Sequence, residues 1–110
     1  MPMLYELRTY ETLPGRMPAL NKRFAEATLK IFARYNMEVV GFWTNEIGGY
    51  SNELVYMMRF DDMADRERKW KAFGADEEWQ KARAASEADG PLLLRISARF
   101  LRPTPYSPAQ

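Results

Sequence analysis

Polar and apolar residues alternate along the segment MLYELRTY, which spans residues 3–10. A period of two residues is typical of a β-strand with two different faces. One face carries Met3, Tyr5, Leu7 and Thr9, and the other carries Leu4, Glu6, Arg8 and Tyr10. The Leu-Pro-Gly sequence at residues 13–15 predicts the end of this strand.

The next segment, from Arg16 to about Tyr35, repeats apolar residues every three or four positions. The stripe consists of Met17, Leu20, Phe24, Ala27, Ile31 and Tyr35. This spacing predicts an amphipathic helix that packs the stripe against the core. Pro18 fits the first helical turn, and Asn36 suits a left-handed residue that ends a helix.

Two strands are predicted next, at residues 37–45 and 53–60, and the Gly48-Gly49 pair between them favours a hairpin loop over residues 47–52. A helical region in two pieces follows, before a last strand at residues 92–101. The first helical piece is expected to have an N-cap at Asp61 or Asp62 and inward-facing Met63, Trp70 and Phe73, and to be interrupted at Gly74. The second piece is expected to have an N-cap at Asp76 and a buried Trp79, and to end at Gly90-Pro91.

The predicted order is β-α-β-β-α-β, which indicates an α+β fold of the ferredoxin-like type with a four-stranded antiparallel sheet. Helices on one side leave the opposite face of the sheet uncovered, so that face is either solvated or paired with a second subunit. We expect one domain over residues 1–102 and a proline-rich C-terminal tail over residues 103–110.

The composition limits the partners and the kinds of catalytic site that the chain can have. The 16 basic and 15 acidic residues nearly cancel, so neither nucleic acid nor a membrane surface is an expected partner. The chain has no cysteine and no histidine, which excludes disulfides, thiolate nucleophiles, imidazole bases and the common metal-ligand sets. A catalyst in this chain would rely on carboxylates, Tyr, Lys, Arg or a bound cofactor. The N-terminal residues show no signal-peptide pattern, and we expect a cytoplasmic protein.

Three segments resemble the NIPSNAP family: YELRTYETLPGR at residues 5–16, GFWTNEIGGYSNELVYMMRFDDMADRERKW at residues 41–70, and DEEW at residues 76–79. The similarity extends over roughly residues 3–101. The resemblance implies a dimeric α/β barrel, in which two ferredoxin-like subunits pair their open sheet faces. The wider superfamily includes cofactor-free monooxygenases, muconolactone-type isomerases and haem-handling proteins, whereas the NIPSNAP branch has no agreed reaction.

The resemblance therefore implies a homodimeric small-ligand-binding or stress-associated protein of undefined activity, without a cofactor. The alternative is a cofactor-free monooxygenase or isomerase acting on a small aromatic or lactone substrate. Expected partners are a second copy of the chain and a small apolar or anionic molecule. Whether the protein is an enzyme stays open from the sequence.

Charged residues on adjacent predicted strands are the first candidates for a site. In the strand order that the resemblance implies, Glu6 and Arg8 neighbour Arg59 on one side and Arg95 and Arg99 on the other. We favour a cross-strand ion-pair lattice, in which Glu6 pairs with Arg59 or another arginine. The alternatives are a small anion site, since arginine binds carboxylates well, and plain solvent exposure at strand ends.

The aromatic candidates have two interpretations as well. Tryptophans at such positions usually belong to a core, but Trp43, Tyr56 and Trp79 could instead wall an apolar pocket. The predicted ligand-binding residues are Glu6, Arg8, Trp43, Tyr56, Arg59 and Trp79. For the enzyme alternative, Tyr10, Glu46 and Arg8 are the candidate acid, base and anion clamp. No metal site is expected.

Overall fold

The computed structural model describes residues 3–110, so the first two residues of the predicted domain lie outside it. Its elements are β1 (Leu4–Thr12), α1 (Met17–Arg23), the π-helical segment η1 (Phe24–Thr28), α2 (Leu29–Arg34), β2 (Glu38–Thr44), β3 (Glu53–Phe60), α3 (Met63–Ala75), α4 (Glu77–Ser86) and β4 (Leu93–Leu101). The predicted order of helices and strands is confirmed.

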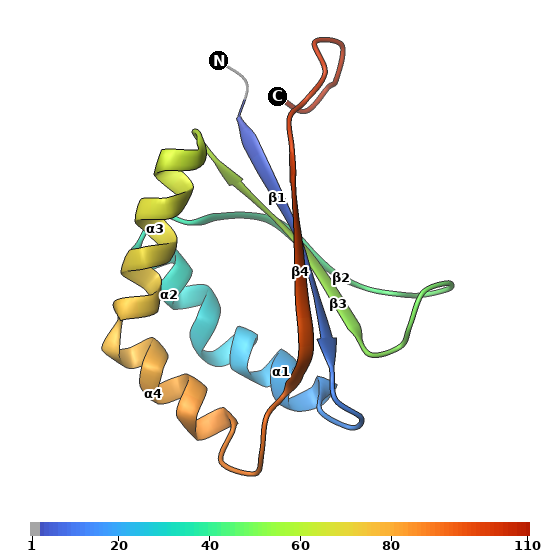
Figure 1. Ribbon diagram of the computed structural model, residues 1–110, viewed down its shortest axis with the longest axis vertical. Coiled ribbons are helices and arrows are strands. Elements are labelled where there is room, and N and C mark those ends of the chain that lie inside the picture. The colour runs from blue at the N-terminus through green and yellow to red at the C-terminus, as the bar shows by residue number, and fades with distance from the viewer. Residues whose placement is uncertain (1–2) are drawn as a thin grey trace.

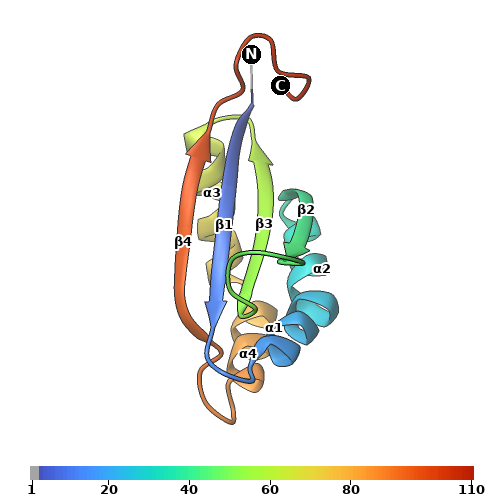
Figure 2. The ribbon, with the colours of Figure 1, turned by 90° about the vertical axis from the view of Figure 1, so that its right-hand side faces the viewer.

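The four strands form one antiparallel sheet in the order β2-β3-β1-β4. All the helices lie on one side of this sheet (Figure 1), and the opposite face is left bare (Figure 2). This is the predicted ferredoxin-like arrangement. Because β2 and β4 are edge strands, the sheet of one chain stays open.

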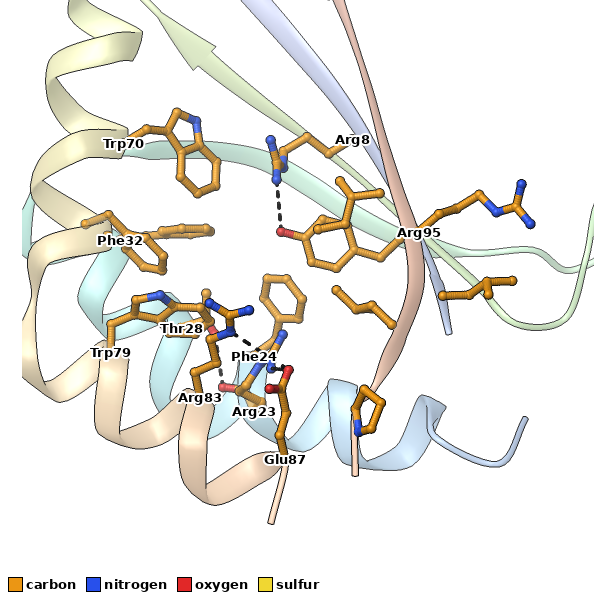
Figure 3. Close-up of a pocket in the computed structure, with 17 residues that line it drawn as sticks. Arg8, Arg23, Phe24, Thr28, Phe32, Trp70, Trp79, Arg83, Glu87 and Arg95 are labelled. Atoms are coloured by element: carbon orange, nitrogen blue, oxygen red, sulfur yellow. Dashed lines mark hydrogen bonds and ion pairs between the residues drawn. The ribbon is translucent and has the colours of Figure 1, made fainter. Parts of the chain in front are cut away.

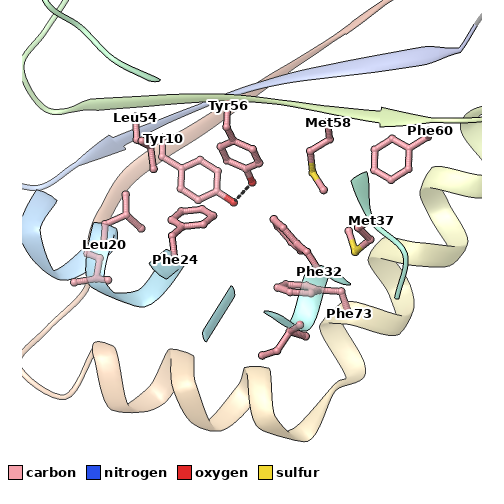
Figure 4. Close-up of a cluster of buried hydrophobic side chains, with 12 residues drawn as sticks. Tyr10, Leu20, Phe24, Phe32, Met37, Leu54, Tyr56, Met58, Phe60 and Phe73 are labelled. Atoms are coloured by element: carbon pink, nitrogen blue, oxygen red, sulfur yellow. Dashed lines mark hydrogen bonds between the residues drawn. The ribbon is translucent and has the colours of Figure 1, made fainter. Parts of the chain in front are cut away.

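The alternation of buried and partly buried residues along the strands shows which face of the sheet contacts the core. Leu54, Tyr56, Met58 and Phe60 of β3 are buried under the helices, and the intervening residues of β3 are only partly buried. Phe24, Ile31 and Phe32 of the first helical stretch and Phe73 of α3 complete the cluster (Figure 4). The apolar helix face and the even-numbered strand face therefore meet, as their periods predict.

The first helical stretch contains a π-helical segment that the sequence pattern did not predict. In it the wider turn rotates the buried face by about one residue. Thr28, Ile31 and Phe32 are buried, while the predicted Ala27 and Tyr35 are only partly buried. The hydroxyl of Thr28 donates to the backbone carbonyl of Arg23 at 3.3 Å, a side-chain to backbone bond within the same helical stretch.

Between α3 and α4 the chain bends at Asp76 rather than at Gly74. The carboxylate of Asp76 accepts from the backbone N–H of Trp79 and caps α4, as predicted. Asp62 caps α3 in the same way. The inward orientation predicted for Met63 was wrong: it lies in the first turn of α3 and is exposed.

The bare face of the sheet carries two additions. The β2–β3 loop extends away from the helical layer (Figure 1), and the tail after β4 folds back at one end of the sheet. The hydroxyl of Tyr5 donates to the backbone carbonyl of Gln110 at 3.0 Å, which leaves Tyr5 buried although it lies on the bare face. Over the described part of the chain, no helix is long and apolar enough to cross a bilayer.

Candidate functional site

A cleft of about 580 Å³ separates the helical layer from strands β1 and β4 (Figure 3). This volume is in the range of small-molecule sites. The cleft has aromatic and aliphatic walls formed by Phe24, Phe32, Trp70, Phe73, Trp79 and Ile96. Polar side chains gather at two ends: Arg8 lies near Trp70, and Arg23, Arg83 and Glu87 lie near Trp79.

Arg8 is held on three sides at the first end. Its Nε donates to the Tyr56 hydroxyl at 2.8 Å, and its Nη2 donates to the Tyr10 hydroxyl at 3.2 Å. Its Nη1 donates to Oε2 of Glu6 at 2.8 Å. The guanidinium also lies 4.4 Å from the centre of the Trp70 ring, a cation–π distance. Burial lowers the pKa of Arg8, but the neighbouring Tyr56, Tyr10 and Glu6 more than offset this and raise it.

Glu6 is the fully buried anion of this cluster. Its carboxylate accepts from Nε and Nη2 of Arg66 at 3.1 and 3.0 Å and from Nε1 of Trp70 at 3.0 Å, besides Arg8. Burial acts to raise the pKa of Glu6, but the hydrogen bonds from Arg66 and Arg8 outweigh it and lower the pKa. A buried carboxylate with this many donors stays charged and fixes the positions of both arginines.

The Tyr10 and Tyr56 rings meet edge to face, with centroids 5.3 Å apart. The hydroxyl of Tyr56 donates to that of Tyr10 at 2.8 Å. Burial, and next the proximity of Tyr10, raises the pKa of Tyr56 well above its ordinary value, against the opposing charge of Arg8. Tyr10 lines the cleft, whereas Tyr56 lies behind it in the core.

Arg23 supplies a second buried cation at the other end. Its guanidinium lies 5.2 Å from the Trp79 ring centre, and its Nη1 donates to the Ser86 hydroxyl at 3.2 Å and lies 3.6 Å from Oε1 of Glu87. Burial lowers the pKa of Arg23, although Glu87 opposes this. Within residues 3–110 the buried Nε of Arg23 has no hydrogen-bond partner.

The structure brings together part of the predicted set. Arg8, Tyr10 and Trp79 line the cleft, and Glu6 and Tyr56 support it from behind. Trp43 lies on the bare face of the sheet and is 52% exposed, so it is not part of this cleft. Glu46 lies in the exposed β2–β3 loop and does not join Tyr10 and Arg8.

The predicted ion pair between Glu6 and Arg59 was wrong. Arg59 lies opposite Tyr5 in the register of β1 and β3, so its side chain is on the bare face, while Glu6 faces the helices. Arg59 instead pairs with Glu38 of the neighbouring strand at 2.7 Å. Glu6 and Arg59 do lie on adjacent strands, as predicted, but their side chains are on opposite faces of the sheet.

Arg95 and Arg99 also lie apart from Glu6 and Arg8. They occupy odd-numbered positions of β4, opposite Glu11 and Leu7 of β1, and Arg95 pairs with Glu11 at 2.9 Å. Only the backbone side of Arg95 borders the cleft, because its guanidinium points away from it (Figure 3).

Sequence reasoning missed Arg66 and Trp70 as partners of Glu6, and Arg23 as a cleft residue. The four-residue spacing of Arg66 and Trp70 puts both on one face of α3, and that spacing was a usable signal. Arg23 has no such signal, because it lies next to the predicted apolar stripe and not in it, and yet it is buried. Among residues 3–110, no group of acidic side chains is arranged to hold a metal ion.

Comparison with known proteins gives a consistent picture. The model of the NIPSNAP family matches residues 5–108. Human NipSnap homolog 3B is 34% identical over 77 residues, which cover 70% of this chain and 30% of that protein. Zebrafish (Danio rerio) NipSnap homolog 1 is 29% identical over 107 residues, 97% of this chain and 36% of that protein. The chain thus spans about a third of the length of these curated relatives.

Solved structures also point to the NIPSNAP family. A NIPSNAP family protein of unknown function from Agrobacterium tumefaciens superposes with a TM-score of 0.85 at 28% identity, over 99% of this chain and 95% of that one. An uncharacterized NIPSNAP-like domain protein from Burkholderia xenovorans superposes with a TM-score of 0.84 at 26% identity, over 96% of this chain and 89% of that one. A putative antibiotic biosynthesis monooxygenase from Caulobacter crescentus superposes with a TM-score of 0.62, over 94% of this chain and 91% of that one. At 13% sequence identity, this similarity shows a shared fold alone. With its family match and these relatives, the chain belongs to the NIPSNAP family.

Proposed function

We propose that this protein binds a small, largely apolar anion in the cleft between its helices and its sheet, and that it does so as a homodimer. The observation that carries the proposal is the cleft itself, which combines aromatic walls with buried guanidinium groups. A core that served stability alone would be filled by side chains at close packing density and would leave no space of this size.

The charge balance of the cleft supports an anionic ligand. Among residues 3–110, Arg8, Arg23 and Arg83 line the cleft, Arg95 borders it with its guanidinium turned away, and Glu87 is the one carboxylate of the lining. Glu87 is also far from an ideal partner, since it lies 3.6 Å from Arg23 and 3.9 Å from Arg83. Arginine forks favour carboxylate or phosphate oxygens, and the flanking aromatic rings favour a flat apolar body.

The bare face of the sheet supports the homodimer. Val55 and Met57 lie at its centre and are only partly buried, and Trp43 is exposed beside them. In the β2–β3 loop, Ile47 is 96% exposed and Tyr50 is 68% exposed. Apolar groups gathered in this way on one face are typical of a subunit interface, and pairing two such faces would bury them.

The ligand is tested by what the protein carries through purification. We expect non-denaturing mass spectrometry of freshly purified protein to detect a bound small acid, and solvent extraction to release it. Ile96→Glu places a negative charge at the exposed mouth of the cleft and should abolish this retention. Ala84→Glu adds the same charge on an exposed part of α4 away from the cleft and serves as the control. Equal retention by both variants would contradict the proposal.

A second candidate function is a cofactor-free oxygenase or isomerase acting on a small aromatic or lactone substrate. The observation in its favour is the contact of Tyr10 with Arg8 at the cleft wall, since a hydroxyl beside a cation would stabilise an enolate oxygen. Of the predicted trio, Glu46 is outside the cleft, and Glu87 is the carboxylate that borders it. Once the ligand is known, two measurements separate the two functions. Deuterium incorporation into the ligand in D2O would show isomerase turnover, and oxygen uptake would show oxygenase turnover, whereas binding alone produces neither.

A further inference from the structure

The hydroxyl of Tyr10 has an unusual set of partners. It accepts from Nη2 of Arg8 at 3.2 Å and from the Tyr56 hydroxyl at 2.8 Å. The Tyr56 hydroxyl in turn accepts from Nε of Arg8 at 2.8 Å. Since a guanidinium has no acceptor, Arg8 donates to both tyrosines, and a single proton lies between the two hydroxyl oxygens.

The direction of that proton follows from burial. If Tyr10 donated to Tyr56, the proton of Tyr56 itself would lack an acceptor, in a side chain with 0% exposure that does not border the cleft. An unpaired buried donor is costly, and proteins rarely leave one. Tyr56 therefore donates to Tyr10. The proton of Tyr10 then has no acceptor in residues 3–110, although Tyr10 borders the cleft.

We propose that Tyr10 is the ligand-recognising donor of the cleft, and that it binds the anionic oxygen of an aromatic carboxylate. This rests on the proposed function and names the chemical class of its ligand. A carboxylate oxygen only accepts hydrogen bonds, so it satisfies the free Tyr10 proton without bringing a competing donor. Such a bond is charge-assisted and stronger than one between neutral groups.

Arg8 orients and polarises this donor. Each of its nitrogens already has a protein partner, in Tyr56, Tyr10 and Glu6. Its positive charge nevertheless lies at the end of the cleft where the carboxylate would be bound. Glu6 is shared with Arg66, so one buried carboxylate serves two guanidinium groups, and Arg66 has the exposed Glu67 as a second partner.

The aromatic side chains that line the cleft near Tyr10 can pack against an aromatic ring of a ligand. The Phe24 ring centre lies 5.7 Å from that of Tyr10, and the Phe32 and Trp70 rings meet edge to face at 5.7 Å. In the view of Figure 3, Trp70 lies to the left of Arg8 and Phe24 lies below it. A flat ring with one carboxylate can therefore contact aromatic faces while its oxygen reaches Tyr10.

The test compares 2-naphthoate with 2-naphthylmethanol, which has the same ring system but a neutral oxygen. Calorimetry and the fluorescence of Trp70 and Trp79 report binding to the intact protein. We expect wild type to bind the acid at least about tenfold more tightly than the alcohol. Tyr10→Phe should weaken binding of the acid by about tenfold or more and change that of the alcohol much less. Tyr106→Phe, at an exposed tyrosine of the tail, is the matched control.

Tyr56→Phe tests the proton direction independently. If Tyr56 donates to Tyr10, removing its hydroxyl leaves the Tyr10 proton as free as before, and the acid binds no more tightly. Tighter binding would show that Tyr10 had been donating to Tyr56, and would overturn the inference. Equal binding of acid and alcohol by wild type and by Tyr10→Phe would also overturn it, while leaving the ligand site in place. If neither probe binds wild type at about 1 mM, the proposed function fails as well.

Discussion

Nη1 of Arg8 lies 2.8 Å from Oε2 of Glu6, two residues earlier on the same face of β1. The same carboxylate oxygen lies 3.0 Å from Nη2 of Arg66 in α3. Glu6 therefore links the sheet to the helical layer and fixes the guanidinium that borders the cleft. Stability and the geometry of the site depend on one buried carboxylate.

Glu6→Gln is expected to lower the free energy of unfolding by about 3 kcal/mol, because two arginines lose a buried anionic partner. Denaturation in urea, followed by circular dichroism, measures the loss. Glu67→Gln is the matched control: it removes the other carboxylate bound to Arg66, which is 63% exposed, and should cost less than about 1 kcal/mol. Equal losses in the two variants would contradict a structural role for the buried cluster.

The stability of the fold should fall in acid between about pH 4 and pH 2, in part through Asp76. The Tyr35 hydroxyl, the backbone N–H of Trp79 and Arg34 lower the pKa of Asp76 from its ordinary value of 3.8 to about 2. A carboxylate with a lowered pKa stabilises the fold above its unfolded pKa, and this contribution is lost as pH falls through the folded pKa.

Melting temperatures measured from pH 6 to pH 2 check this expectation. Asp76→Asn removes the titrating group, so the melting temperature of this variant should decrease less steeply between pH 4 and pH 2 than that of wild type. Residual steepness is expected, because the pKa of Glu6 and that of Asp65 are also lowered. Identical pH profiles for variant and wild type would exclude Asp76 as a contributor.

Gly74→Ala should stabilise the protein by about 0.5–1 kcal/mol. Gly74 lies in α3, has no positive φ, and a Cβ there would meet no atom within 4 Å. Alanine costs less chain entropy in a helix than glycine does. Gly15→Ala is the contrasting control, since Gly15 has a φ of +77° and alanine would be strained there. Chemical denaturation should show opposite signs for the two changes.

Met57→Glu should convert the proposed dimer into a monomer. Met57 lies opposite Leu7 on the bare face of the sheet, and a charge there would be buried without a partner in a face-to-face dimer. We expect an interface of more than about 1,200 Å² in wild type. Light scattering at micromolar concentration measures the mass. Met63→Glu, on an exposed turn of α3, should stay dimeric, and a monomeric wild type would contradict the dimer altogether.

The sequence by itself determined the elements and their order. The two-residue alternation of residues 3–10 and the three-to-four-residue spacing of residues 17–35 predicted a strand and a helix correctly, because both periods follow from backbone geometry and local burial. The caps at Asp62 and Asp76 were likewise readable, since a capping carboxylate binds N–H groups only a few residues away.

Only the tertiary structure decided which charges meet. Glu6 and Arg59 lie on neighbouring strands, but the register puts them on opposite faces. The true partner Arg66 comes from a helix 60 residues further along the chain. The π-helical turn that buries Thr28, and with it one wall of the cleft, also had no local signal. Local periodicity fixes how each element is built, whereas partners across a buried interface depend on strand register and on how the helical layer packs over the sheet.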